Sequence, residues 1–296
     1  MMSDARPMWG EMSVLQSGRL ASEQFPNGEL RLFGLLGDPV AQVRAPFPAT
    51  ELMRKAGANA ALLPMHVTPA DLADVFAALR RIGNLDGLVI TVPHKLAMAA
   101  LVDDLTERAR LAGAVNLARR DGDGRWRGEM VDGFAFARGL AQSGFAPRGQ
   151  RALLVGAGGA GSAVAAELVR EGAELRLYDA SLPRAQALAA HLARGGFPGV
   201  MVLDRPDPAG CALVVNATPL GMKSDDPLPV DPAALDPAML VAEVVMKPPV
   251  TALLDQAKRR GCRIQLGEAV MFNQLDAMVG FLLDGRVAGD STAGRN

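Results

Sequence analysis

The sequence predicts an α/β protein in which short buried strands alternate with helices. Three observations support this fold class: short apolar runs recur between turn residues, segments with helical spacing of apolar residues separate them, and one run leads through a glycine cluster into a helix. The chain has 296 residues, of which 49% are hydrophobic, so we expect two domains. Such alternation favours mostly parallel sheets covered by helices.

Charge and cysteine content exclude several classes of protein. The net charge is −1 and the pI is about 6.3, which argues against nucleic acid or an anionic membrane as a partner. Cys211 and Cys262 form no paired motif, and His66, His94 and His191 show no metal-ligand spacing. No apolar run is long enough to span a membrane. We therefore expect a cytoplasmic monomer or homodimer that acts on a small molecule without a metal ion.

The first half of the chain predicts one α/β domain. Residues 1–29 show no clear period and are expected to form an N-terminal extension. Apolar runs predict strands, and Thr68 followed by Pro69 marks a helix start, since threonine caps helices and proline suits their first position. The expected strands are Leu30 to Leu36, Ala61 to Val67, Leu85 to Thr91, Ala114 to Ala118 and Arg125 to Met130; the expected helices are Pro46 to Gly57, one from Thr68, Leu96 to Leu101, Thr106 to Ala112 and Gly133 to Gly144.

A glycine cluster organises the second half. The apolar run Ala152 to Val155 leads into a glycine turn and then a helical pattern, which is the context of a dinucleotide-binding motif. The turn is Gly156-Ala157-Gly158-Gly159-Ala160-Gly161. Its glycines permit a tight turn, a close approach of backbone to pyrophosphate, and packing of helix on strand. Free N–H groups at the helix start then attract phosphate.

The next strand, Glu174 to Tyr178, ends at Asp179. This acid lies about 20 residues after Gly156, where a ribose-binding carboxylate is expected. The segment therefore predicts a Rossmann-type domain that binds NAD in preference to NADP, although Arg184 leaves NADP open. The alternative is a glycine-rich turn without a cofactor.

The last part of the chain predicts a second cofactor contact and a closing helix. Strands are expected at Val200 to Leu203, Ala212 to Val215, Leu240 to Val245 and Ile264-Gln265, and a helix at Val270 to Leu283. A loop of small residues follows one of these strands and should face the cofactor, because ligands bind beyond the carboxyl ends of parallel strands. Its candidate cofactor residues are Asn216, Thr218, Pro219, Gly221 and Met222; the alternative is an ordinary proline-glycine loop.

Taken in order, these motifs resemble the shikimate/quinate dehydrogenase family over residues 33–283. They are Gly37-x-Pro39, Thr91-x-Pro93-x-Lys95, Gly113-Ala114-Val115-Asn116, Asp132-Gly133, the glycine turn, Asn216-Ala217-Thr218-Pro219-x-Gly221-Met222, Pro248-x-x-Thr251 and Gln274. The resemblance implies a substrate domain (residues 30–138 and 270–290) and a nucleotide domain (146–269). It also implies an active site in the cleft between them and a last helix that returns to the first domain.

The resemblance also implies a catalytic Lys95–Asp132 pair. Oxidation of an alcohol by hydride transfer releases the hydroxyl proton, and an ammonium beside a carboxylate can polarise the oxygen and shuttle that proton. A free lysine, with a pKa of about 10.4, is a poor base at neutral pH. Burial and the carboxylate act on it in opposite directions, so general base and electrostatic stabiliser both stay open.

The substrate positions depart from the family pattern. Val43 and Ala45 replace two serines that bind the substrate carboxylate in the family, Val89 replaces an asparagine, and Val131 and Met246 replace a threonine and a tyrosine. Three polar positions are kept: Thr91, Asn116 and Gln274. A buried polar group without a partner costs about 1–3 kcal/mol, so the changes predict weak binding of shikimate.

The sequence therefore predicts a nicotinamide-dependent oxidoreductase acting on an alcohol or ketone less polar than shikimate. One alternative is a true shikimate or quinate dehydrogenase with a rebuilt pocket, in which Arg44 or another cation binds the carboxylate. Another is a non-catalytic sensor of nucleotide or metabolite. The substrate, the direction of reaction and the oligomeric state stay open.

Overall fold

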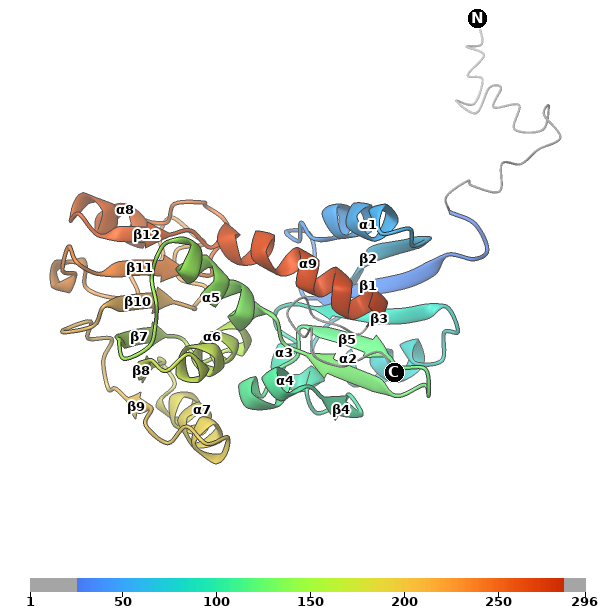
Figure 1. Ribbon diagram of the computed structural model, residues 1–296, viewed down its shortest axis with the longest axis horizontal. Helices are drawn as coiled ribbons and strands as arrows, with labels where there is room; N and C mark the ends of the chain where they lie inside the picture. Colours follow the sequence, from blue (N-terminus) through green and yellow to red (C-terminus); the bar gives the residue numbers. More distant parts are fainter. Residues whose placement is uncertain (1–25, 285–296) are drawn as a thin grey trace, which may run out of the picture.

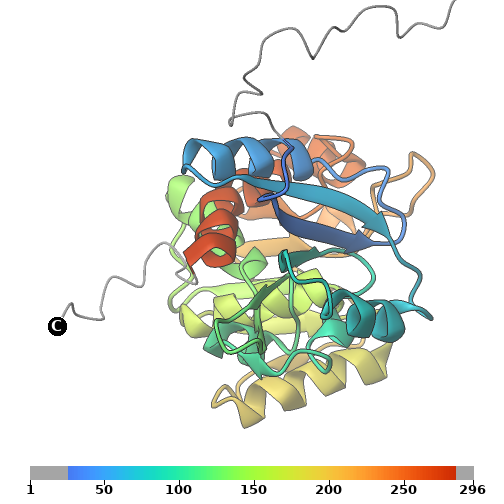
Figure 2. The ribbon, with the colours of Figure 1, turned by 90° about the vertical axis from the view of Figure 1, so that its right-hand side faces the viewer.

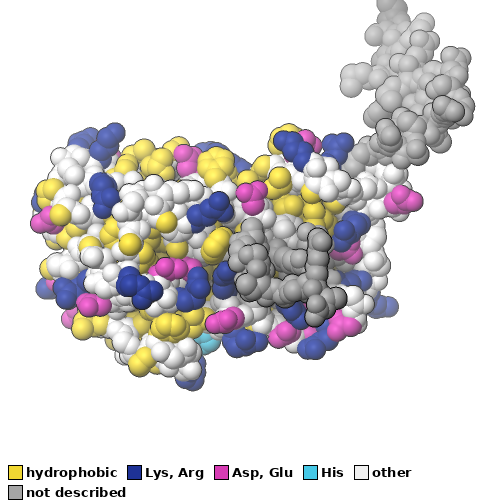
Figure 3. All heavy atoms as spheres, in the orientation of Figure 1, with side chains coloured by type: hydrophobic (Ala, Val, Ile, Leu, Met, Phe, Trp, Pro, Cys, Tyr) yellow, Lys and Arg dark blue, Asp and Glu magenta, His cyan; other side chains and the backbone are white. Residues whose placement is uncertain are grey.

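The computed structural model describes residues 26–284 as two six-stranded sheets that lie side by side (Figure 1). Most of the expected N-terminal extension, the polar tail and residues 285–290 of the expected substrate domain lie outside the described residues. Between residues 26 and 284, no helix is long and apolar enough to cross a membrane. On the face shown in Figure 3, basic and acidic side chains are interspersed and neither sign dominates.

The first sheet has the order β2-β1-β3-β5-β6-β4. Its strands are β1 (Arg31–Gly37), β2 (Ala60–His66), β3 (Leu85–Ile90), β4 (Asp104–Leu105), β5 (Leu117–Arg120) and β6 (Trp126–Glu129). The helices between them are α1 (Pro46–Lys55), α2 (Leu72–Leu79), α3 (Lys95–Met98) and α4 (Glu107–Ala112). β1, β2 and β3 are parallel as expected, whereas β5 runs antiparallel to both of its neighbours.

Alternating side chains of this sheet enter two different cores. Phe33 and Leu35 of β1 pack with α1 and with the last helix, α9 (Glu268–Asp284), while Leu36 packs on the other face with Phe76 of α2. This is the two-residue period of a strand that is buried on both faces. Figure 2 shows α1 above β1 and β2, and α2 below them.

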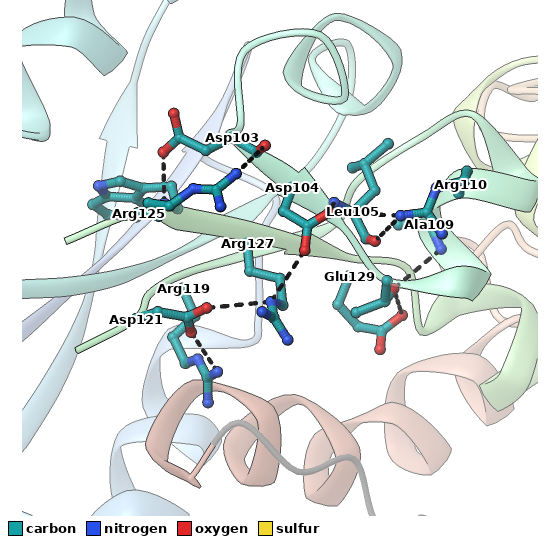
Figure 4. Close-up of polar contacts among 12 residues, drawn as sticks. Asp103, Asp104, Leu105, Ala109, Arg110, Arg119, Asp121, Arg125, Arg127 and Glu129 are labelled. Atoms are coloured by element: carbon teal, nitrogen blue, oxygen red, sulfur yellow. Dashed lines mark hydrogen bonds and ion pairs between the residues drawn. The ribbon is translucent and has the colours of Figure 1, made fainter. Parts of the chain in front are cut away.

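Charged side chains at the outer edge of the first sheet form ion pairs with one another. Arg127 of β6 bridges Asp104 and Asp121, and these acids also pair with Arg110 and Arg119 (Figure 4). Exposed ion pairs contribute little stability one by one. The cluster is therefore an ordinary charged surface at the edge of the sheet.

The second sheet is wholly parallel, with the order β12-β11-β10-β7-β8-β9. Its strands are β7 (Arg151–Val155), β8 (Glu174–Tyr178), β9 (Met201–Val202), β10 (Leu213–Asn216), β11 (Leu240–Glu243) and β12 (Arg263–Gln265). Its helices are α6 (Gly159–Arg170), α7 (Leu182–Arg194) and α8 (Ala252–Arg259), with a short 3₁₀ turn at Pro232–Ala234. This is the Rossmann order, and its reversal point lies between β7 and β10.

Two helices join the sheets. α5 (Asp132–Gln142) follows the first sheet and packs on α6, and α9 returns from the second sheet to the first (Figure 1). Gln142 and Asn273 hydrogen-bond across α5 and α9 at 3.0 Å. α5 and α6 approach so closely that a Cβ on Gly133 would overlap the carbonyl oxygen of Ala163. The start of α5 is thereby fixed against the nucleotide side.

Gly133→Ala should lower the melting temperature, because a backbone carbonyl occupies the space of the new methyl group. Overpacking costs about 1–3 kcal/mol, which exceeds the roughly 1 kcal/mol that alanine gains over glycine in a helix. Gly83→Ala is the matched control, since a Cβ there meets nothing within 4 Å. Thermal unfolding followed by circular dichroism measures both; equal melting temperatures for the two variants would contradict the packing argument.

Candidate active site

Lys95 and Asp132 form an ion pair at the carboxyl end of the first sheet. Lys95 is the first residue of α3, which follows β3, and Asp132 is the first residue of α5, which follows β6. Lys95 Nζ donates to Asp132 Oδ2. The two side chains are only 14% and 10% exposed, so the pair is largely shielded from water. The structure thus brings together two charges that are 37 positions apart in the chain.

Asn116 fixes the carboxylate of this pair. Its amide nitrogen donates to Asp132 Oδ1 at 2.7 Å, and its amide oxygen accepts the Val131 N–H at 3.0 Å. Both carboxylate oxygens therefore have donors. The Val115 N–H donates to the Lys95 carbonyl at 2.8 Å, which ties the same segment to the start of α3.

The glycine turn lies directly against the lysine. A Cβ on Gly159, the first residue of α6, would be 2.8 Å from Lys95 Cβ. Because α6 begins at the reversal point of the second sheet, a dinucleotide bound there would reach the Lys95–Asp132 pair.

The turn has the shape that a pyrophosphate needs. Gly156 has φ +109°, a conformation that strains any residue with a Cβ. A Cβ on Gly161 would overlap the Gly156 carbonyl, so helix and strand can meet only through glycine. The N-cap of α6, Gly158, has no side chain to cap the helix, which leaves the N–H groups of its first turn, including that of Ala160, for a ligand. These residues fit a dinucleotide.

Asp179 follows β8 and is nearly buried, at 9% exposed. Its Oδ2 accepts the Ala157 N–H at 2.8 Å, and its Oδ1 accepts the Ser181 N–H, also at 2.8 Å. Arg184 approaches Oδ1 at 3.4 Å with a side chain that is 57% exposed. The carboxylate is thus fixed beside the glycine turn, with one cation at its outer side.

The loop after β10 packs on the same turn. A Cβ on Gly156 would lie 2.9 Å from both the backbone of Ala217 and Thr218 Cγ2. Asn216 Oδ1 accepts from both the N–H and the hydroxyl of Thr218, at 3.1 and 2.6 Å. Pro219, Gly221 and Met222 continue this loop, and Met222 is 54% exposed. The loop therefore lies against the glycine turn, and its contact with a cofactor stays a prediction.

Four of the apolar substrate candidates share one cluster. Val89 and Val131 are buried in it, and Val43 and Ala45 pack against it. Thr91 follows β3 and is half-buried against Gly37, where a Cβ would overlap Thr91 Cγ2.

The two remaining candidates belong to other elements. Gln274 is half-buried on α9. Met246 lies in the segment after β11 and is 39% exposed. The roles of all these substrate residues stay predictions.

Two hollows of the described surface do not coincide with the pair. One of about 300 Å³ is lined mainly by the segment from Leu220 to Pro229, and one of about 470 Å³ lies between α5, the segment 144–147 and α6. Neither is lined by Lys95 or Asp132. We therefore place the candidate site at the ion pair and its contact with the glycine turn. A proton transfer requires such charged groups, whereas the volume of a hollow does not indicate any chemistry.

Glu243 was not among the sequence candidates. It ends β11, is fully buried, and hydrogen-bonds to Asn216 of the cofactor loop at 2.9 Å. Its signal in the sequence is an acid inside the apolar run Leu240-Val241-Ala242-Glu243-Val244-Val245. Charged residues are rarely fully buried unless they have partners, so an acid in this run indicates a specific role.

Comparison with known proteins identifies the family. Residues 35–118 match the shikimate dehydrogenase substrate binding domain. A shikimate dehydrogenase (NADP⁺) of Rubrobacter xylanophilus is 38% identical over 253 residues, which cover 84% of this chain and 89% of that protein. One of Paramagnetospirillum magneticum is 40% identical over 262 residues, covering 86% and 92%. The chain belongs to the shikimate dehydrogenase family.

Solved structures show the same fold. Shikimate dehydrogenase from Aquifex aeolicus aligns with a TM-score of 0.79 at 27% identity, covering 88% of this chain and 95% of that one. Quinate dehydrogenase from Corynebacterium glutamicum, solved with NAD, aligns with a TM-score of 0.77 at 30% identity, covering 87% and 94%. The predicted fold class and the predicted enzyme class, a nicotinamide-dependent dehydrogenase, are therefore confirmed.

Lys95→Ala should lower kcat by about 10² or more, as expected for loss of a general acid–base group. Adding Asp132→Asn should cost little further, because groups that act as one unit are not additive. Lys55→Ala, an exposed lysine in the last turn of α1, is the control and should keep full activity. Steady-state kinetics with the alcohol that turns over fastest in a substrate screen provide the measurement, and near-normal turnover of Lys95→Ala would refute the assignment.

Proposed function

We propose that this dehydrogenase oxidises an alcohol, or reduces the corresponding ketone, on a substrate less polar than shikimate. The observation that carries the proposal is the apolar cluster of Val43, Ala45, Val89 and Val131, which adjoins the Lys95–Asp132 pair at Val131. A shikimate carboxylate or hydroxyl placed against these side chains would lose its water without gaining a partner.

The start of α1 supports the same conclusion. α1 follows β1 and therefore begins at the sheet edge where α3 and Lys95 begin after the parallel strand β3. Its N-cap, Ala45, offers no side-chain hydrogen bond. Pro46 and Pro48 have no N–H, so two of the four free donors of a normal helix start are missing. This helix end is thus poorly suited to hold a carboxylate.

The paired charges provide the proton chemistry. A bound nicotinamide supplies the hydride acceptor or donor, held by the glycine turn and by the loop from Asn216 to Met222. Lys95 Nζ faces the substrate oxygen and carries the proton that this oxygen loses on oxidation or gains on reduction. Asp132 holds the ammonium in place, and Asn116 holds Asp132. Lys95 Nζ carries three hydrogens and donates one of them to Asp132, so it has donors left for the substrate oxygen.

For the cofactor we propose NAD in preference to NADP. The named relatives are NADP⁺ enzymes, whereas the quinate dehydrogenase was solved with NAD. Asp179 supports NAD, because a fixed carboxylate can accept from ribose hydroxyls and repels a 2′-phosphate. The residue after Asp179 is Ala180, at a position where an arginine would bind the 2′-phosphate and favour NADP. Arg184 is the one cation that contacts Asp179 among the described residues.

The second candidate is a true shikimate or quinate dehydrogenase. The names of the relatives favour it, and Arg44 is an exposed cation between the two lost serine positions. In that case Arg44 would bind the substrate carboxylate, and Arg44→Ala would abolish shikimate turnover. Our proposal predicts that the wild-type enzyme already turns over little shikimate, so that Arg44→Ala should change this rate little.

The cofactor proposal predicts a higher kcat/KM with NAD than with NADP. Asp179→Ala should reduce that preference by removing the repulsive charge, and Arg184→Ala should lower the rate with NADP more than with NAD. Arg194→Ala, in the last turn of α7, is the control arginine and should change neither rate. A clear NADP preference that Asp179→Ala leaves unchanged would overturn the proposal.

The substrate proposal predicts a kcat/KM for shikimate well below the ordinary enzyme range of roughly 10⁴ M⁻¹ s⁻¹ and above. Val43→Ser together with Ala45→Ser should raise it by restoring two hydroxyl donors. Ala41→Ser makes the same chemical change on the same segment at an exposed position and should have no effect. Ordinary shikimate turnover by the wild-type enzyme would show that the serines are not needed.

A further inference from the structure

Glu243 is a buried carboxylate beneath the proposed cofactor loop. It ends β11 directly opposite Asn216, which ends β10. Its exposed fraction is 0%, and burial raises its pKa above the ordinary value of a glutamate, an effect only partly opposed by hydrogen bonds from Asn216 and Thr251. A buried acid held by two neutral donors is costly for a fold, which suggests a role beyond packing.

Each oxygen of Glu243 receives one donor from a different element. Asn216 Nδ2 donates to Oε1 at 2.9 Å, and the Thr251 hydroxyl donates to Oε2 at 2.7 Å. Thr251 is the N-cap of α8 and also accepts the Leu254 N–H at 3.3 Å. Glu243 therefore connects the loop after β10 to the start of α8.

The bond to Glu243 is one of the bonds that orient the Asn216 amide. Its nitrogen also donates to the Leu220 carbonyl at 3.0 Å, and its oxygen accepts twice from Thr218. Both amide hydrogens and both oxygen lone pairs are therefore used. An ionised carboxylate can only accept, so it requires the nitrogen of Asn216 to face the sheet and the oxygen to face the loop.

The far end of the loop closes on the same network. Gly221 has φ +98°, and a Cβ there would lie 3.1 Å from Thr251 Cβ. Asp226 Oδ2 accepts the N–H groups of Gly221 and Lys223, each at 2.9 Å. The near end, at Ala217 and Thr218, lies on the Gly156 turn. The whole loop is thus held between the glycine turn and the Glu243–Thr251 contact.

We infer that Glu243 is a positioning residue for the nicotinamide cofactor: it fixes the loop from Asn216 to Met222 against the glycine turn by accepting hydrogen bonds from Asn216 and Thr251. It touches neither cofactor nor substrate itself. The inference rests on the proposed cofactor site, but it is independent of which alcohol the enzyme oxidises and of the choice between NAD and NADP.

Glu243→Met is the sharpest test, because it keeps the length of the side chain and removes both acceptors, so that the Asn216 amide and the Thr251 hydroxyl lose their partner. Glu243→Gln should bind more nearly like the wild type, because its amide oxygen can accept from Asn216 while the Thr251 hydroxyl turns to accept from its amide nitrogen. The dissociation constants of NADH and NADPH, measured by nicotinamide fluorescence with the purified full chain, should rise by about tenfold in Glu243→Met. Thr251→Val should raise them as well, whereas Thr251→Ser keeps the hydroxyl and should bind like the wild type.

Glu167→Met is the matched control. Glu167 is another buried glutamate of the nucleotide side, 4% exposed and paired with Arg170. Its loss should lower the melting temperature while leaving cofactor binding unchanged. Unchanged dissociation constants in Glu243→Met would overturn the inference and leave the proposed function intact; if Glu243→Met does not fold, equal constants in Thr251→Val and Thr251→Ser would overturn it. A wild-type protein that binds neither cofactor would overturn the cofactor site itself.

Discussion

The candidate site depends on the close approach of α5 and α6, in which a Cβ at Gly133 would overlap the carbonyl oxygen of Ala163. α5 begins with Asp132, and α6 begins with Gly159, which rests against Lys95. The same packing therefore brings the carboxylate, the ammonium and the glycine turn into one place. A larger residue at Gly133 would separate the helices and move acid and cofactor turn apart, and catalytic geometry tolerates shifts of this kind poorly.

The candidate site combines a polar part and an apolar part. The Asp132 carboxylate accepts from Lys95 and Asn116, whereas Val43, Ala45, Val89 and Val131 belong to an apolar cluster. On our proposal, reactivity and selectivity are thus assigned to different residues. On our proposal, a shikimate carboxylate against these side chains would lose its water without gaining a partner, so that a family member could keep the catalytic pair and still bind shikimate weakly.

Much of the fold could be predicted because its signals are local. The glycine turn, the strand before it and the acid after the next strand follow one another in the chain, so β7, α6, β8 and Asp179 were found directly. The antiparallel direction of β5 could not be found, because its apolar run reads the same in either direction. Glu243 was missed for a related reason: its partners, Asn216 and Thr251, lie 27 and 8 positions away, and only the sheet register aligns them.

The sequence by itself determined the family, the enzyme class, the residue types available for proton transfer and the absence of serines at positions 43 and 45. These are properties of residue identity and order. The tertiary structure decided which of these groups meet: that Asn116 bonds Asp132, that Gly159 touches Lys95, and that Asp179 is fixed by the N–H groups of Ala157 and Ser181. Such contacts depend on the packing of helices and the register of strands, which bring distant parts of the chain within hydrogen-bonding distance and which no local pattern encodes.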